Sequence, residues 1–96
     1  MNLKVIDPAI VEFNEAIEYY NLQESELGYK FSDCVELAFA RIIDKPEWNI
    51  RVDKNVYRIR VKLFPYKIYY FIDDGDLVII AILHNHRRPG LWKNRK

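Results

Sequence analysis

The sequence predicts an α+β fold in which two helices cover one face of a mainly antiparallel sheet. Two observations favour this fold. Hydrophobic residues recur with a helical period in the first half of the 96-residue chain, and with the period of two that is typical of strands in the second half. A helical hairpin needs an apolar surface to cover, and a meander of strands supplies one. The length and the globular composition, half hydrophobic and 30% charged, indicate a single domain over residues 1–96.

The first half of the chain predicts a short strand followed by a helical hairpin. The strand is expected at 3–6, and Asp7-Pro8 follows it, where Asp is a favoured helix cap and Pro suits the first helical turn. A first helix should extend to about residue 22. Its apolar stripe consists of Phe13, Ala16, Ile17 and Tyr20. Ser25 is the expected cap of a second, antiparallel helix, which Pro46 ends. The stripe of this helix consists of Leu27, Phe31, Val35, Ala38 and Ile42.

The second half predicts three strands in a meander, which complete a four-stranded sheet with the N-terminal strand. After a polar stretch at 47–55, residues 58–63 alternate between cations and aliphatic side chains, which indicates a strand with one basic, solvent-exposed face. Residues 64–66, around Pro65, interrupt it before a second strand at 67–72. An Asp-Gly turn leads into the run 77–83, which is apolar at every position and is expected to be a central strand. A short basic tail follows.

The charged residues are unevenly divided along the chain. Residues 1–48 hold four Lys and Arg against ten Asp and Glu, a formal charge of −6, whereas residues 49–96 hold eleven against four, a charge of +7. The net charge of +1 therefore describes neither half. A basic half in a small protein favours an anionic ligand, either nucleic acid or an acidic partner protein. We expect acidic helices on one side of the molecule and a basic sheet on the other.

Other features of the sequence exclude several classes of protein. The single cysteine, Cys34, has no partner for an internal disulfide and falls in a helical apolar pattern, so we expect a small buried hydrophobe. The chain shows no secretion signal, and its most apolar run is far shorter than a membrane span, which favours a cytoplasmic protein without a membrane partner. Zinc-site spacings, phosphate-binding glycine loops and nucleophile elbows are absent. We therefore expect no cofactor and no metal.

A basic cluster in the second half is the candidate functional surface. Its cations come from one face of the strand at 58–63 and from the tail, and we expect the two groups to converge on a phosphate or carboxylate. The predicted surface consists of Arg58, Arg60, Lys62, His84, His86, Arg87, Arg88 and Trp92. A simpler interpretation is that the strand cations discourage edge-to-edge pairing. Tyr57 and Trp92 could stack on bases or serve as packing residues.

Metal-free RNA cleavage is one chemistry that these residues would permit. Such a site needs one group that takes the 2′-hydroxyl proton, another that protonates the leaving oxygen, and cations that stabilise charge on phosphorus. Histidine suits either proton transfer near neutral pH, so His84 and His86 are the candidates. Arg58, Arg60 or Arg88 would supply the positive charge. A histidine that ends a central strand is equally often a hydrogen-bonded structural residue.

Motifs at characteristic spacings are spread through most of the chain. In the first half they are Phe13-x-Glu15-Ala16, Tyr19-Tyr20, Leu27-Gly28-x-x-Phe31, Ile42 and Pro46. In the second half they are Tyr57-Arg58, Arg60, Phe64-Pro65-Tyr66-x-Ile68-x-Tyr70, Val78-Ile79-x-Ala81 and His84-x-x-Arg87-Arg88-Pro89-x-x-Trp92-x-x-Arg95. In this order they resemble the RelE/ParE superfamily of toxins from bacterial type II toxin–antitoxin modules, and are most similar to its ParE-like, plasmid-stabilisation branch.

The resemblance implies a toxin that stops growth unless a cognate antitoxin occupies it. It also implies the strand, helical hairpin and antiparallel sheet predicted above. Antitoxins of such pairs are typically acidic or partly disordered tails on DNA-binding domains, which suits a basic surface. The complex would reach operator DNA only through the antitoxin.

Members of the superfamily differ in mechanism, and the resemblance alone does not decide between two cellular targets. ParE-like members inhibit DNA gyrase and are not nucleases, whereas RelE-like members cut mRNA in the ribosomal A site and often carry a C-terminal tyrosine. Residues 90–96 contain no tyrosine, which favours the gyrase target. The alternatives are a metal-independent endoribonuclease acting on ribosome-bound mRNA, or a non-toxic antitoxin-binding module. The candidate catalytic residues of a nuclease are Arg58, Arg60, His84 and Arg87.

Overall fold

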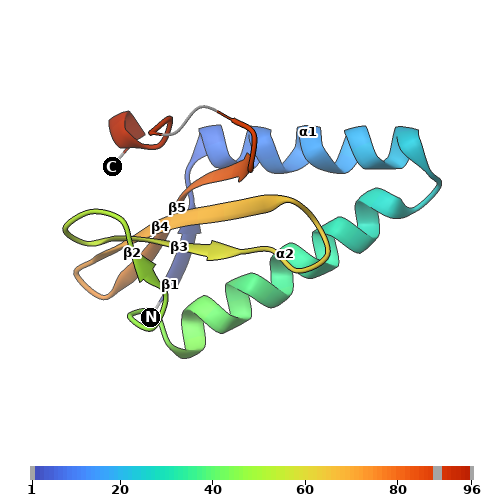
Figure 1. Ribbon diagram of the computed structural model, residues 1–96. Coiled ribbons are helices and arrows are strands. Elements are labelled where there is room, and N and C mark those ends of the chain that lie inside the picture. Colours follow the sequence, from blue (N-terminus) through green and yellow to red (C-terminus); the bar gives the residue numbers. More distant parts are fainter. Residues whose placement is uncertain (1, 88–89, 96) are drawn as a thin grey trace.

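The computed structural model describes residues 2–87 and 90–95, which form a helical hairpin and a five-stranded sheet (Figure 1). The helices are α1 (Asp7–Gln23) and α2 (Leu27–Asp44). The strands are β1 (Asn2–Val5), β2 (Ile50–Arg51), β3 (Val56–Arg60), β4 (Tyr66–Asp73) and β5 (Asp76–His84). A short 3₁₀ helix, η1 (Lys93–Arg95), lies near the beginning of α1 (Figure 1). The predicted α+β class is confirmed, and neither α1 nor α2 is long and apolar enough to cross a membrane.

The sheet has the strand order β1-β5-β4-β3-β2 and is antiparallel except for β1, which runs parallel to β5. The prediction of four strands is wrong by one, because β2 forms inside the polar stretch at 47–55. A strand of two residues is too short to show a period of two. The strand expected at 58–63 instead ends at Arg60, because Leu63 adopts a positive φ of 70° in the turn before β4.

The helical hairpin forms as predicted, but with different caps. Ile6 is the N-cap residue of α1, so Asp7 lies inside the first turn, where its negative carboxylate interacts favourably with the positive end of the helix dipole. Glu26, with a φ of 67°, is the N-cap of α2 in place of Ser25. The helix α2 ends before Pro46, as predicted. The hairpin therefore depends on its apolar stripes more than on side-chain caps.

The main core lies between the hairpin and one face of the sheet, which we call the helix-covered face. Phe31 is fully buried at its centre. Four aromatic rings contact it, those of Phe13, Tyr20, Phe64 and Tyr66. The sheet contributes Tyr57, Ile59, Ile68, Tyr70, Leu77, Ile79 and Ile82 to this core. Cys34 is buried in the same cluster, as predicted. The alternate residues of these strands form the opposite face, called the open face below.

Candidate functional site

The open face of the sheet carries basic side chains from β3 and β4. Because the alternate residues of β3 are buried in the core, Arg58 and Arg60 lie on the open face. The strand register pairs Arg58 with Tyr69, and Arg60 with Lys67. Like charges at directly opposite positions repel each other, so an anion bound beside Arg60 and Lys67 would relieve their repulsion. The prediction that cations gather on one sheet face is therefore supported for these residues.

The end of β5 holds His84 at the border of this surface. His84 lies opposite Tyr66 in the register, and the two rings meet edge to face with 5.3 Å between centroids. In the following loop, the backbone N–H of His86 donates to Nδ1 of His84 at 3.0 Å, and the two imidazoles stack at 5.1 Å. The N–H of Arg87 donates to the His84 carbonyl. His84 is thus fixed by both neighbouring rings and by the loop.

Residues 90–95, the C-terminal segment, cover another part of the open face. Trp92 is only 5% exposed and stacks on Tyr69, with 5.6 Å between centroids and 18° between planes. A packing role for Trp92 therefore agrees with the structure better than a free base-stacking platform does. Tyr57 likewise is buried on the helix-covered face, where it stacks on Tyr70.

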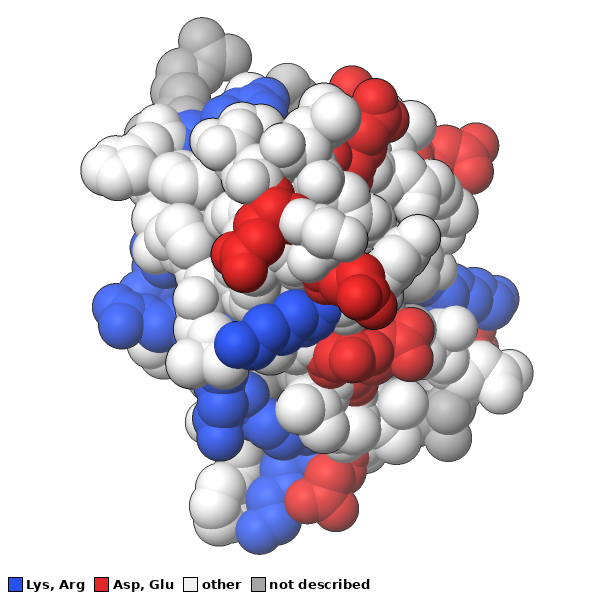
Figure 2. Space-filling model, turned by 90° about the vertical axis from the view of Figure 1, so that its right-hand side faces the viewer, with Lys and Arg blue, Asp and Glu red and all other residues white. Residues whose placement is uncertain are grey.

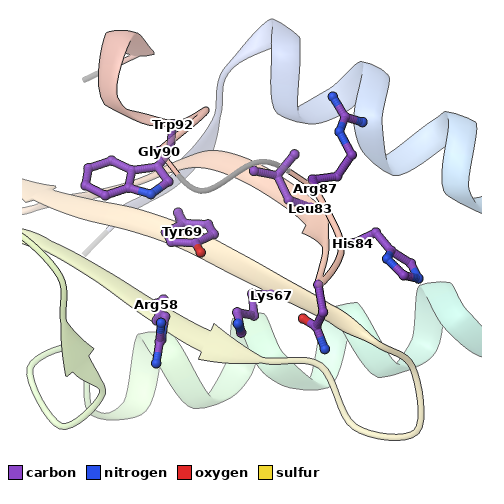
Figure 3. A pocket seen from close by; sticks show the side chains of 9 residues that line it. Arg58, Lys67, Tyr69, Leu83, His84, Arg87, Gly90 and Trp92 are labelled. Carbon is purple, nitrogen blue, oxygen red and sulfur yellow. The ribbon is translucent and has the colours of Figure 1, made fainter.

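These elements enclose a cavity of about 150 Å³, which we call the basic pocket (Figure 3). Its described lining includes three cations, one histidine and no carboxylate. The lining residues are Arg58, Lys67, Tyr69, Leu83, His84, Asn85, Arg87, Gly90 and Trp92. Figure 3 shows the Arg87 side chain extending toward α1, away from Arg58 and Lys67. Positive charge is thus concentrated where Arg58 and Lys67 line the cavity, an arrangement that suits an acidic group entering beside them.

The structure brings together only some of the predicted surface residues. Arg60 lies on the open face but outside the pocket lining, and His86 is exposed on its stack with His84. The strand position predicted for Lys62 is wrong, because β3 ends before it; Lys62 lies in a turn and lines a separate cavity beside α2. Arg88 lies outside the described residues. The predicted residues that do line the basic pocket are Arg58, His84, Arg87 and Trp92.

Sequence reasoning missed several residues of the basic pocket, chiefly Lys67 and Tyr69. Both lie on the open face, because they alternate with the buried Ile68 and Tyr70 of β4. The period of two in this strand could have placed them on one face. Their position beside Arg58 depends on the register between β3 and β4, which the sequence does not reveal.

Proton transfer in the basic pocket would depend on His84. The nearby Tyr66 is unsuited to act as a base near neutral pH, because burial raises the pKa of its phenol, an effect that the Arg87 guanidinium only partly opposes. Among the described residues, no group of three His, Cys, Asp or Glu side chains is placed to hold a metal ion. Binding of an anion is thus the property that the pocket's side chains support most directly.

Basic and acidic side chains are unevenly distributed over the face of the molecule seen in Figure 2. In Figure 2, most Lys and Arg side chains lie toward the left and the bottom of the view, and most Asp and Glu side chains lie toward its centre and upper right. The separation is incomplete, since a blue side chain also lies at the far right. The view shows one face of the molecule, on which the two signs are partly separated and partly mixed, since blue and red side chains also meet near its centre and bottom.

Comparison with known proteins identifies the family. The family model described as "ParE toxin of type II toxin-antitoxin system, parDE" matches residues 4–89. None of the curated proteins matches the chain.

Solved structures show the same fold at low identity. The chain is similar to a structure of the chromosomal ParDE toxin–antitoxin system from P. aeruginosa, with a TM-score of 0.77 and 12% identity over 88% of this chain and 95% of that one. A mutant RelE toxin from E. coli in the free state gives a TM-score of 0.71 and 13% identity over 98% of this chain and 90% of that one. The intact RelBE toxin–antitoxin complex from E. coli gives a TM-score of 0.63 and 14% identity over 90% of this chain and 98% of that one. Because the family model spans most of the chain, the protein belongs to the ParE toxin family of type II toxin–antitoxin systems.

Proposed function

We propose that the protein is a cytoplasmic toxin that inhibits DNA gyrase, and that the basic pocket contacts the target. The observation that supports this most is the make-up of the pocket. Three cations and an aromatic wall line the pocket together with a single imidazole, whose Nδ1 already accepts a backbone N–H. These groups suit binding to an acidic surface more than they suit two successive proton transfers.

A cognate antitoxin is the partner that membership of this family implies. We propose that an acidic segment of the antitoxin covers the basic pocket and so competes with the target. Attraction between such charged surfaces is screened by salt. The affinity between toxin and antitoxin should therefore fall as the salt concentration rises, and it should fall less for a Lys67→Ala variant.

A supercoiling assay tests the gyrase proposal. Purified protein should block supercoiling by the gyrase of its own host, or leave gyrase-linked DNA breaks. Lys67→Ala should raise the half-maximal inhibitory concentration about tenfold, because it removes a cation from the pocket lining. Lys30→Ala removes the same charge from an exposed position on α2 and serves as the control. Undiminished supercoiling at saturating protein would overturn the proposal.

Cleavage of ribosome-bound mRNA is the second candidate function. One observation favours it: His84, Arg58 and Arg87 all line the same pocket, as a metal-free nuclease would require. Cuts at the ribosomal A site that disappear in His84→Ala would support this function and exclude the gyrase proposal as the main activity. A protein that leaves growth unchanged when expressed without its antitoxin, in a host with a susceptible target, would instead be a binding module.

A further inference from the structure

The edge of β5 beside α1 is only partly covered by a neighbouring strand. The strand β1 pairs with β5 as far as Val5 opposite Ile79, and the chain then enters α1. Beyond this point β5 has a bulge, because Tyr69 and Tyr70 pair with Ala81 and Ile79 and leave Ile80 without a partner on β4. Unpaired backbone groups in such a buried position are unfavourable unless another donor or acceptor reaches them.

Two side chains take the place of the missing strand. Glu12 of α1 accepts the backbone N–H of Ile82 at its Oε1, at 3.0 Å, and Arg95 of η1 donates from Nη1 to the carbonyl of Ile80 at 3.1 Å. The same two atoms form an ion pair of 2.9 Å. The side chains are only 11% and 19% exposed, for Glu12 and Arg95 respectively, so water competes weakly for these charge-assisted bonds.

This ion pair fixes the C-terminal segment, which forms one wall of the basic pocket. The segment is short, and its 3₁₀ helix has three residues, too few to be stable without tertiary contacts. Among its tertiary contacts are the packing of Trp92, which stacks on Tyr69 within the smaller apolar cluster, and the bonds of Arg95 to Glu12 and Ile80. Backbone hydrogen bonds from Lys93 to Gly90 and from Arg95 to Trp92 connect the two contacts. Release of Arg95 should therefore loosen the Trp92 wall as well.

We propose that Glu12 is a positioning residue for the basic pocket. It does not line the pocket, but through Arg95 it fixes the C-terminal segment and so keeps Trp92 stacked on Tyr69. The structural part of the proposal is independent of the target. Its functional part rests on the proposed function, in which the basic pocket contacts gyrase.

Fluorescence of Trp92 tests the structural part. Trp48→Phe removes the second tryptophan, which is highly exposed, and leaves Trp92 as the single reporter. In this background, Glu12→Gln keeps the shape of the side chain but weakens its bond to Arg95. Acrylamide quenching of Trp92 should rise at least about twofold, with a red-shifted emission maximum, because a nearly buried ring becomes solvated part of the time.

Three further variants separate this effect from general unfolding. Arg95→Gln alters the partner on η1 and should increase quenching as much as Glu12→Gln does. The double variant should show no further increase, because the two residues act as a unit. Arg95→Lys keeps the charge and should give an intermediate value. Glu18→Gln, at an exposed position of α1, is the matched control and should leave quenching unchanged.

The supercoiling assay then tests the functional part. Glu12→Gln and Arg95→Gln should each raise the inhibitory concentration about tenfold, while the Glu18→Gln control keeps the potency of the parent protein. Unchanged quenching in both Glu12→Gln and Arg95→Gln would overturn the positioning role. Increased quenching with full potency would overturn its functional part. Failure of the parent protein to inhibit gyrase would count against the proposed function alone, because the fluorescence result does not depend on the target.

Discussion

The two faces of the sheet are built from the same strands but have different chemistry. The helix-covered face carries aliphatic and aromatic side chains that are buried against α1 and α2. The open face carries Arg58, Arg60 and Lys67 beside a smaller buried apolar cluster, in which Val56, Ile80, Ala81 and Leu83 pack with Trp92 of the C-terminal segment. Neighbouring residues along β3 therefore differ in role: those on the helix-covered face stabilise the core, and the cations on the open face are the ones we propose to bind the target. Substitutions on the helix-covered face should therefore lower the free energy of unfolding, whereas substitutions of the cations on the open face should lower inhibitory potency and leave stability nearly unchanged.

The largest loss of stability should follow substitution at the centre of the helix-covered face. Phe31 is fully buried among four aromatic rings, so Phe31→Ala leaves a cavity that the neighbouring rings cannot refill. The free energy of unfolding should fall by about 3–5 kcal/mol. Urea denaturation followed by circular dichroism measures this loss. Tyr29→Ala, 61% exposed on the same helix, should change it by less than about 0.5 kcal/mol.

A smaller loss is expected at Gly28, where the beginning of α2 packs against α1. The N–H of Gly28 donates to Oδ1 of Asn21 at 2.7 Å, and a Cβ at Gly28 would meet the carbonyl oxygen of Ile17. Gly28→Ala should force the helices apart and destabilise the fold by about 1–3 kcal/mol. Thermal unfolding measures the effect, with Glu36→Ala on the exposed side of α2 as the control. An unchanged melting temperature would show that the hairpin can shift without cost.

Tyr70 should give a loss of stability that depends on pH. Its hydroxyl donates to the carbonyl of Pro46 at 2.6 Å and accepts from Nδ2 of Asn49 at 2.9 Å, so Tyr70→Phe should cost about 1–2 kcal/mol near neutral pH. Burial raises the pKa of Tyr70, and the hydrogen bond from Asn49 only partly opposes this. The folded protein therefore keeps the phenol proton at pH values where the unfolded chain loses it.

The sign of the pH effect follows from this difference in proton binding. The contribution of Tyr70 to the free energy of unfolding should be complete below about pH 10, the unfolded pKa, and should decrease as the pH rises through the folded pKa. Urea denaturation at about pH 8 and about pH 11 should show a smaller alkaline loss for Tyr70→Phe than for the parent protein. Equal alkaline losses would assign the effect to other groups, such as Tyr20 and Tyr66, whose pKa values burial also raises.

The helix-covered face could be predicted from the sequence more fully than the open face. The stripe from Phe31 to Ile42 and the alternation over 58–60 depend only on local periodicity and were placed correctly, whereas Leu27 lies outside the main core and β3 ends before Lys62. The basic pocket depends on contacts between distant segments, such as Arg58 beside Tyr69 and Trp92 on Tyr69. The ion pair of Glu12 with Arg95 joins residues from opposite ends of the chain and replaces a strand that stops early. Local patterns carry no information about such contacts.

The most direct test of this separation is a single substitution on the open face, examined for stability and activity together. Arg58→Ala removes a half-buried cation of the basic pocket without leaving a cavity in the core. It should change the free energy of unfolding by no more than about 0.5 kcal/mol. At the same time it should raise the concentration needed to inhibit gyrase supercoiling at least about tenfold. Full inhibitory potency in a folded Arg58→Ala protein would contradict the assignment of target binding to the open face.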